Sequence, residues 1–186
     1  MSERKLVDRV VTLLKGHLPQ GCTVRKGANL YYRIPLRSDE KTCVASWDRP
    51  SRGRTAFQTD LCIFRLKKGH EIPRVVIEFK RGMTTHDVIT YSDKALRHKQ
   101  VYRWLRYGMV SFGLDAIPSR FFLHNEGLDF CLAIKDPRDE RHLRSRLDFL
   151  VESQVKISDE LESLQFRGRN KLANYFGTSV KFCLLT

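Results

Sequence analysis

Two short apolar runs joined by a charged turn form the clearest hydrophobic pattern in the chain. Residues 61–64 read Leu-Cys-Ile-Phe, and residues 75–80 read Val-Val-Ile-Glu-Phe-Lys. Strand formers separated by a polar turn predict a β-hairpin. Alternation along the second strand sends its apolar side chains to one face and Glu78 and Lys80 to the other. The sequence therefore places a carboxylate and an ammonium side by side on one face of a sheet strand.

Apolar residues at helical spacing predict three longer helices. The first is capped by Ser2 and runs to about residue 15, where Gly16 and Pro19 follow. The second begins at Thr84 or Thr85 and extends to about residue 107. The third covers residues 139 to about 164, with a possible break near Ser158.

Further strands complete the predicted sheet. One or two are expected in residues 22–37, with a bend at 27–29, and another at 110–113 after a turn at Gly108. Residues 121–123 and 128–134 predict a hairpin that turns at 125–127. This order of elements indicates an α/β protein with a central mixed β-sheet flanked by α-helices. We expect a single domain over 1–186, with a core at about 2–114 and a hairpin, helices and a tail over 120–186.

The net charge of the chain indicates which class of partner it binds. The chain of 186 residues has 34 basic and 21 acidic residues, a net charge of +13. An excess of this size indicates a polyanionic partner, of which nucleic acid is the commonest; a membrane surface is the competing interpretation. We expect no membrane association and a soluble, cytoplasmic protein, because the N-terminus is charged and no 18-residue apolar run occurs. The five cysteines form no CxxC pair, so neither a disulfide framework nor a structural zinc site is predicted.

A third polar residue, Asp60, is expected near the strand face that carries Glu78 and Lys80. Asp60 stands immediately before the first strand of the hairpin, so pairing of the two strands brings it to the same place. Two carboxylates and a lysine around one point suit a hard, oxygen-preferring cation such as Mg²⁺ and a water molecule beside it. The alternative is an ion pair between Glu78 and Lys80 on a solvated sheet face.

Asp60 followed by Glu78-Phe79-Lys80 resembles the motif of the PD-(D/E)xK nuclease superfamily. The order of elements is also similar, from the first helix to the strand after the second helix, about residues 2–114. Thr59 stands where the family often has proline. The resemblance implies a restriction-endonuclease-like fold. It also implies Asp60, Glu78 and Lys80 as catalytic residues.

The metal site and its chemistry are likewise implied by this resemblance. Asp60, Glu78 and the backbone oxygen of Phe79 are the expected Mg²⁺ ligands, and Mn²⁺ is expected to substitute. Some family members add an acid from the first helix, which makes Glu3 a further candidate; a favourable charge at a helix N-terminus is its other interpretation. Lys80 is expected to orient or deprotonate the water that attacks the phosphodiester.

Basic and polar residues outside the motif are candidates for contacts with nucleic acid. One group lies in an arginine-rich segment before Asp60, a second on the helix after Lys80, and a third near the C-terminus. The candidates are Arg49, Arg52, Arg54, Lys94, Lys99, Gln100, Arg167, Arg169 and Lys171. For the first group, a solvated linker is the alternative interpretation.

Together with the basic charge, the resemblance to this superfamily implies a Mg²⁺-dependent DNA endonuclease of restriction type that leaves 5′-phosphate ends. A Holliday-junction resolvase or DNA-repair nuclease of the same fold is one alternative, and a non-catalytic nucleic-acid-binding module is another. A homodimer is expected, because one site attacks one strand of a duplex at a time. The apolar segment 180–185 is a candidate contact between the two copies; an edge strand of the monomer is the alternative.

Overall fold

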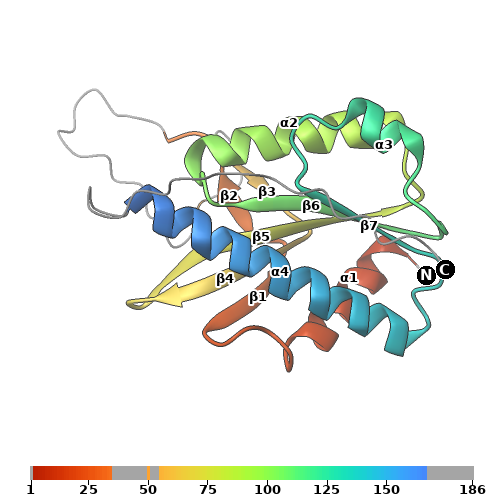
Figure 1. Cartoon of the computed structure of the whole chain (residues 1–186), viewed down its shortest axis with the longest axis horizontal. Helices are drawn as coiled ribbons and strands as arrows, with labels where there is room; N and C mark the ends of the chain where they lie inside the picture. Colours follow the sequence, from red (N-terminus) through yellow and green to blue (C-terminus); the bar gives the residue numbers. More distant parts are fainter. Residues whose placement is uncertain (1, 35–49, 51–54, 167–186) are drawn as a thin grey trace.

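The central feature of the fold is a five-stranded mixed sheet (Figure 1). The computed structural model describes residues 2–34, 50 and 55–166. Within them the strand order is β1-β4-β5-β6-β7, with β1, β4 and β5 antiparallel and β5, β6 and β7 parallel. These strands are β1 Cys22–Lys26, β4 Leu61–Lys67, β5 His70–Arg81, β6 Arg106–Phe112 and β7 Phe130–Ile134. A second sheet pairs β2 (Asn29–Tyr31) with β3 (Ala56–Gln58).

Helices cover both faces of the sheet (Figure 1). On one face, α1 (Glu3–Leu14) and α4 (Glu140–Phe166) pack on Val75, Ile77 and Phe79 of β5. On the other face, α2 (Thr85–Val101) and α3 (Ser119–His124) share a core with Val76 and with the small sheet. The two cores follow from the period-2 alternation of β5, whose odd-numbered apolar residues face α1 and α4. The expected α/β architecture, a mixed sheet flanked by helices, is confirmed at this level.

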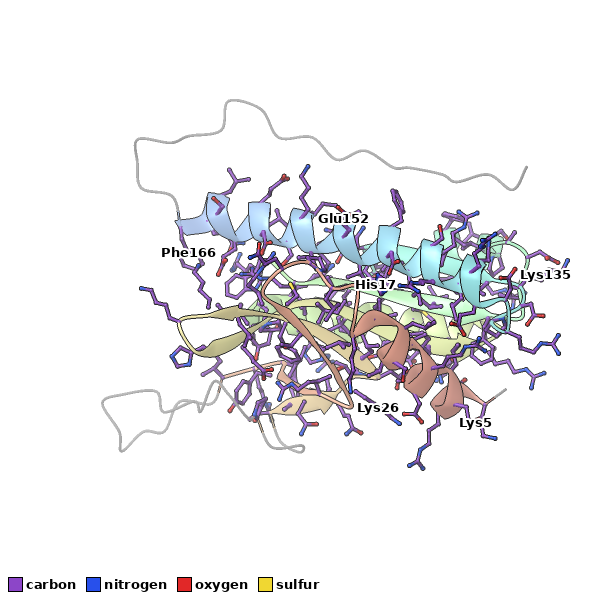
Figure 2. All side chains as sticks on the ribbon, turned by 90° about the horizontal axis from the view of Figure 1, so that it is seen from below. Lys5, His17, Lys26, Lys135, Glu152 and Phe166 are labelled. Carbon is purple, nitrogen blue, oxygen red and sulfur yellow. The ribbon has the colours of Figure 1, made fainter. Side chains whose placement is uncertain are left out.

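The carboxyl ends of the parallel strands meet at one end of the sheet. β5, α2 and β6 form a crossover, and α2 begins just beyond the end of β5 with a capping box between Thr84 and Asp87. The first turn of α1 lies at the same end (Figure 1). Figure 2 shows Lys5 and Lys135 at this end of the molecule and Phe166 at the opposite end. In open α/β sheets, ligands bind beyond the carboxyl ends of strands, so this end is the natural place for a site.

Several predicted elements are confirmed. The first helix forms, and the Ser2 hydroxyl accepts a hydrogen bond from the Lys5 amide at 3.4 Å. The apolar runs of the hairpin become β4 and β5. Residues 22–37 contain two strands, β1 and β2, which flank the expected bend.

The predicted end of the second helix was wrong. α2 ends at Val101, and the next strand starts at Arg106, four residues before its predicted start. Tyr102 and Leu105 are buried and keep a helical spacing although they lie beyond the helix, which explains the error. Gly108 lies within β6 and is not a turn residue.

The predicted hairpin at residues 121–134 was also wrong. Its first arm is α3, and its second arm is β7, which pairs with β6 in parallel. Asn125 ends α3: its side-chain oxygen accepts hydrogen bonds from the Leu128 amide at 2.8 Å and from the Ser92 hydroxyl at 3.1 Å. The predicted break in the last helix is absent as well, because α4 continues past Ser158, which is fully buried.

Some predictions fall outside the part of the chain that the structure describes. These are the roles of Arg49, Arg52, Arg54, Arg167, Arg169, Lys171 and the segment 180–185. Among the described residues, no helix is long and apolar enough to cross a membrane.

Gly108 tests the close approach of β6 and β7. A Cβ at this position would lie 2.3 Å from a ring carbon of Phe130 and 2.4 Å from its carbonyl oxygen. We expect Gly108→Ala to lower the free energy of unfolding by about 1–3 kcal/mol through overpacking. Gly16→Ala is the matched control, because a Cβ there meets nothing within 4 Å. Urea denaturation measures both; equal stabilities of the two variants would contradict the assigned β6–β7 register.

Candidate active site

Asp60 and Glu78 lie opposite each other where β4 begins. Leu61 pairs with Ile77, so the preceding Asp60 faces Glu78 across the two strands. The Asp60 amide donates a hydrogen bond to Oε2 of Glu78 at 3.2 Å, and the Phe79 amide donates one to Oδ2 of Asp60 at 2.9 Å. The Glu78 carboxylate thus binds the Asp60 backbone, and the Asp60 carboxylate binds the backbone of Phe79, the residue after Glu78.

The residues before Asp60 fix its position. Thr59 is buried, and both its amide and its hydroxyl donate to the Ala28 carbonyl, at 2.8 and 3.0 Å. The Asp60 carbonyl accepts a hydrogen bond from the Gly27 amide at 3.0 Å. Gly27 has a φ of +64°, which glycine adopts without strain. The bend between β1 and β2 thus anchors the start of β4.

Glu78 is a buried carboxylate with a complete set of partners. It is 1% exposed, and its Oε1 accepts hydrogen bonds from the Lys94 ammonium at 2.6 Å and from the Tyr107 hydroxyl. Burial raises the pKa of Glu78, the charge of Lys94 opposes that rise, and the nearby Asp60 adds to it. The alternative interpretation, a solvated ion pair between Glu78 and Lys80, is therefore not the arrangement observed.

Lys80 lies on the same face of β5, closer to solvent. Its ammonium is 3.4 Å from Oε2 of Glu3, and it also interacts with Tyr91. Burial alone would lower the pKa of Lys80, but Tyr91 and Glu3 more than offset it, so the pKa is raised. Glu3 also accepts a hydrogen bond from the Arg81 amide at 3.2 Å, which holds the start of α1 against the end of β5.

Tyr91 and Tyr107 are site residues that the sequence analysis missed. Tyr91 lies on α2, and Tyr107 lies on β6, in a stretch that the sequence analysis assigned to the end of the helix. Tyr91 lies between the two lysines, with its ring centre 5.8 Å from the Lys80 nitrogen and 5.6 Å from that of Lys94. Lys94, in contrast, was among the predicted nucleic-acid contacts; it follows Tyr91 by three residues on the helix and is half-buried.

The donor set suits a hard cation. Within the described residues, no hydrogen bond occupies the second carboxylate oxygen of Asp60. The amide of Phe79 points toward Asp60. Because the amide and the carbonyl of a strand residue point toward the same neighbouring strand, the Phe79 carbonyl also points to the side of Asp60. Ser111, in register with Lys80 on β6, is buried, and its hydroxyl has no partner in the described part of the chain. These groups fit a hydrated Mg²⁺, although no cluster of three or more Asp, Glu, His or Cys side chains occurs among the described residues.

The other described candidates lie apart from this cluster. Lys99 is bound within the fold, with its ammonium 2.7 Å from Asp129 and 2.6 Å from the Gly127 carbonyl. Burial lowers the pKa of Lys99, and Asp129 opposes that change. Gln100 is exposed near the end of α2. Of the three polar residues predicted on this helix, the structure brings Lys94 alone to Glu78.

A basic depression lies at the carboxyl ends of β5, β6 and β7. It has a volume of about 270 Å³ and is lined by three basic residues, Arg81, Lys135 and Arg138, and also by the acid Asp136. Lys135 pairs with Asp115 and Arg138 with Asp136, each at 2.8 Å. Arg81 follows Lys80 directly, so the two cations point to opposite faces of the strand end.

No family model matches the chain, and no curated protein matches it. Assignment of the site therefore depends on its geometry and on the sequence motif.

The burial of Glu78 predicts a pH-dependent stability. The pKa of Glu78 in the folded protein is raised above the ordinary value of 4.5. Between the ordinary and the raised value, the folded protein therefore binds more protons than the unfolded chain. The contribution of Glu78 to the free energy of unfolding therefore falls with rising pH. Relative to Glu78→Gln, the wild type should lose stability from about pH 4.5 upward, as measured by urea denaturation across pH.

Glu71→Gln is the control for this comparison, because Glu71 lies on the same strand and is paired with Arg25 at the surface. If the free energy of unfolding of the wild type stays constant or rises with pH relative to that of Glu78→Gln, the pKa of Glu78 is not raised.

Proposed function

We propose that the chain is a Mg²⁺-dependent deoxyribonuclease with a restriction-endonuclease-like fold. The observation that carries the proposal is the paired placement of Asp60 and Glu78 at the start of β4, with Lys80 on the same face of β5. The net charge of +13 supports a polyanionic substrate. A mixed sheet with helices on both faces is compatible with the proposed fold.

The residues divide the work of phosphodiester hydrolysis between them. Asp60, Glu78 and the Phe79 carbonyl would hold Mg²⁺, which when bound neutralises charge on the scissile phosphate and lowers the pKa of a water molecule. The raised pKa of Lys80 keeps its ammonium charged, which favours orienting the attacking water over removing its proton. The oxygen of that water would form a bond to phosphorus and lose a proton to solvent, while the bond from phosphorus to the 3′ oxygen breaks. The 3′ oxygen takes up a proton from solvent, and the products are a 3′ hydroxyl and a 5′ phosphate.

A Holliday-junction resolvase or repair nuclease is the second candidate, and the position of Glu3 favours it. Glu3 reaches both Lys80 and the Arg81 amide, so an acid from the first helix does lie at the edge of the site. Four-way junctions and linear duplexes of the same sequence distinguish the candidates. Paired symmetric cuts in the junction alone indicate a resolvase, and discrete cuts in the duplex indicate a restriction-type enzyme.

Removal of a metal-binding carboxylate should abolish cleavage. We expect Asp60→Ala and Glu78→Ala each to lower the rate of plasmid cleavage in Mg²⁺ by at least about 100-fold, more than loss of a group that merely orients a ligand. Gel analysis of cut plasmid measures the rate, and circular dichroism checks that each variant folds. Glu71→Ala, on the same strand but outside the site, should cleave at the wild-type rate.

Near-normal cleavage by either site variant would contradict the assignment. Wild-type protein that binds DNA but does not cut it with Mg²⁺ or Mn²⁺ would favour the non-catalytic binding module.

The basic depression should contribute phosphate contacts. We expect Arg81→Gln with Lys135→Gln to flatten the dependence of log K on log salt for duplex DNA by about two contacts, at about 0.9 per contact. Lys67→Gln with Lys68→Gln removes the same charge at the β4–β5 turn, at the opposite end of β5, and should leave the slope nearly unchanged. Fluorescence anisotropy over a salt series measures both. Equal salt dependence for the two double variants would show that DNA does not contact the basic depression.

Assembly as a dimer remains part of the proposal. Two copies would present two identical sites to the antiparallel strands of a duplex.

A further inference from the structure

The ammonium of Lys94 is bound by two oxygen atoms from different strands. It lies 2.6 Å from Oε1 of Glu78 and 2.6 Å from the carbonyl oxygen of Gln58 at the end of β3. Its side chain is 18% exposed and that of Glu78 is 2% exposed, so solvent screens the pair weakly. The Tyr107 hydroxyl donates to the same carboxylate oxygen from β6.

This arrangement supplies Glu78 with a counter-charge from within the chain. A buried carboxylate is costly unless it is paired and hydrogen-bonded, and Lys94 meets both needs. Carboxylate and carbonyl oxygens are also the ligands that a hard divalent cation prefers. The ammonium therefore binds to the atoms that would attract Mg²⁺.

Lys94 differs from Lys80 in this respect. Lys80 approaches Glu3 and Tyr91 at the edge of the site, whereas Lys94 contacts the buried carboxylate itself. Two cations beside one carboxylate repel each other strongly where solvent is excluded. Lys94 has a flexible four-carbon side chain, so its ammonium can leave Glu78 without movement of α2.

We propose that Lys94 is the resident counter-ion of Glu78 and that a divalent cation displaces it on binding. The inference rests on the proposed function for the identity of the competing metal ion. Lys94 weakens metal binding and stabilises the metal-free protein. Once displaced, its ammonium lies beside the site and is available to a substrate phosphate.

Chemical labelling of wild-type protein tests the displacement directly. Amine acetylation followed by mass spectrometry reports how accessible each lysine is. Lys94 should be protected without divalent metal and labelled several-fold faster with saturating Mg²⁺ or Ca²⁺. Lys99, on the same helix but paired with Asp129, is the internal control and should not change. Protection of Lys94 that persists when calorimetry shows the metal bound would overturn the proposal.

A substitution tests the competition itself. Lys94→Met keeps an unbranched side chain without the charge, and we expect it to bind Mg²⁺ about tenfold tighter or more, the scale on which a neighbouring charge shifts an ionic equilibrium. Lys99→Met is the matched variant and should bind Mg²⁺ with wild-type affinity. Calorimetry measures the affinity without cleavage, and circular dichroism confirms folding.

The outcomes separate this inference from the proposed function. Equal or weaker Mg²⁺ binding by folded Lys94→Met overturns the counter-ion role while the wild-type metal site stands. Lack of Mg²⁺ binding by both wild type and Lys94→Met overturns the inference together with the metal-dependent function.

Discussion

The charge of Glu78, buried inside the sheet, is the constraint on which the rest of the site depends. A carboxylate excluded from water must be compensated, and here each neighbouring element contributes one group. The start of β4 supplies the Asp60 amide, α2 supplies Lys94, and β6 supplies Tyr107. These contacts also fix how α2 lies over the sheet, so the polar site and the packing of one face are a single arrangement.

The cost of this arrangement indicates a use. Loss of one partner from a buried charge destabilises a protein by about 3–5 kcal/mol, whereas an apolar replacement for the whole set is often neutral or stabilising. An apolar residue at position 78 would match its buried neighbours on β5. A carboxylate at this position, beside Asp60 and one strand away from a Ser111 hydroxyl that has no partner among the described residues, is consistent with the proposed cation site.

Local sequence was sufficient to predict the part of the site on β4 and β5. The strict alternation in residues 75–80 predicts that Glu78 and Lys80 share one face of the strand. The position of Asp60 directly before an apolar run predicts that it lies near Glu78 when the two strands pair. The contact of Tyr107 with Glu78, and hence the full set of groups that surround Glu78 together with Lys94, could be predicted only if the start of the strand after α2 were known. Tyr102 and Leu105 continue the helical spacing beyond the helix, so the sequence pattern hides the start of β6.

The mispredicted hairpin has a related physical cause. Residues 121–123 form a short apolar run that fits either a strand or a buried helical turn. The side chain of Asn125 decides between them by closing the end of α3 onto Ser92 of α2, a residue distant in sequence. The hydrogen bond to Ser92 is tertiary, so it leaves no signature in the local sequence.

The central claim is that a divalent cation binds between Asp60, Glu78 and the Phe79 carbonyl. An anomalous difference map from crystals of the protein grown with Mn²⁺ tests it most directly. The account predicts a strong peak about 2–2.3 Å from oxygens of both carboxylates and of Phe79, with the Lys94 ammonium moved away from Glu78. Bound Mn²⁺ elsewhere, with Lys94 still on Glu78, would contradict it.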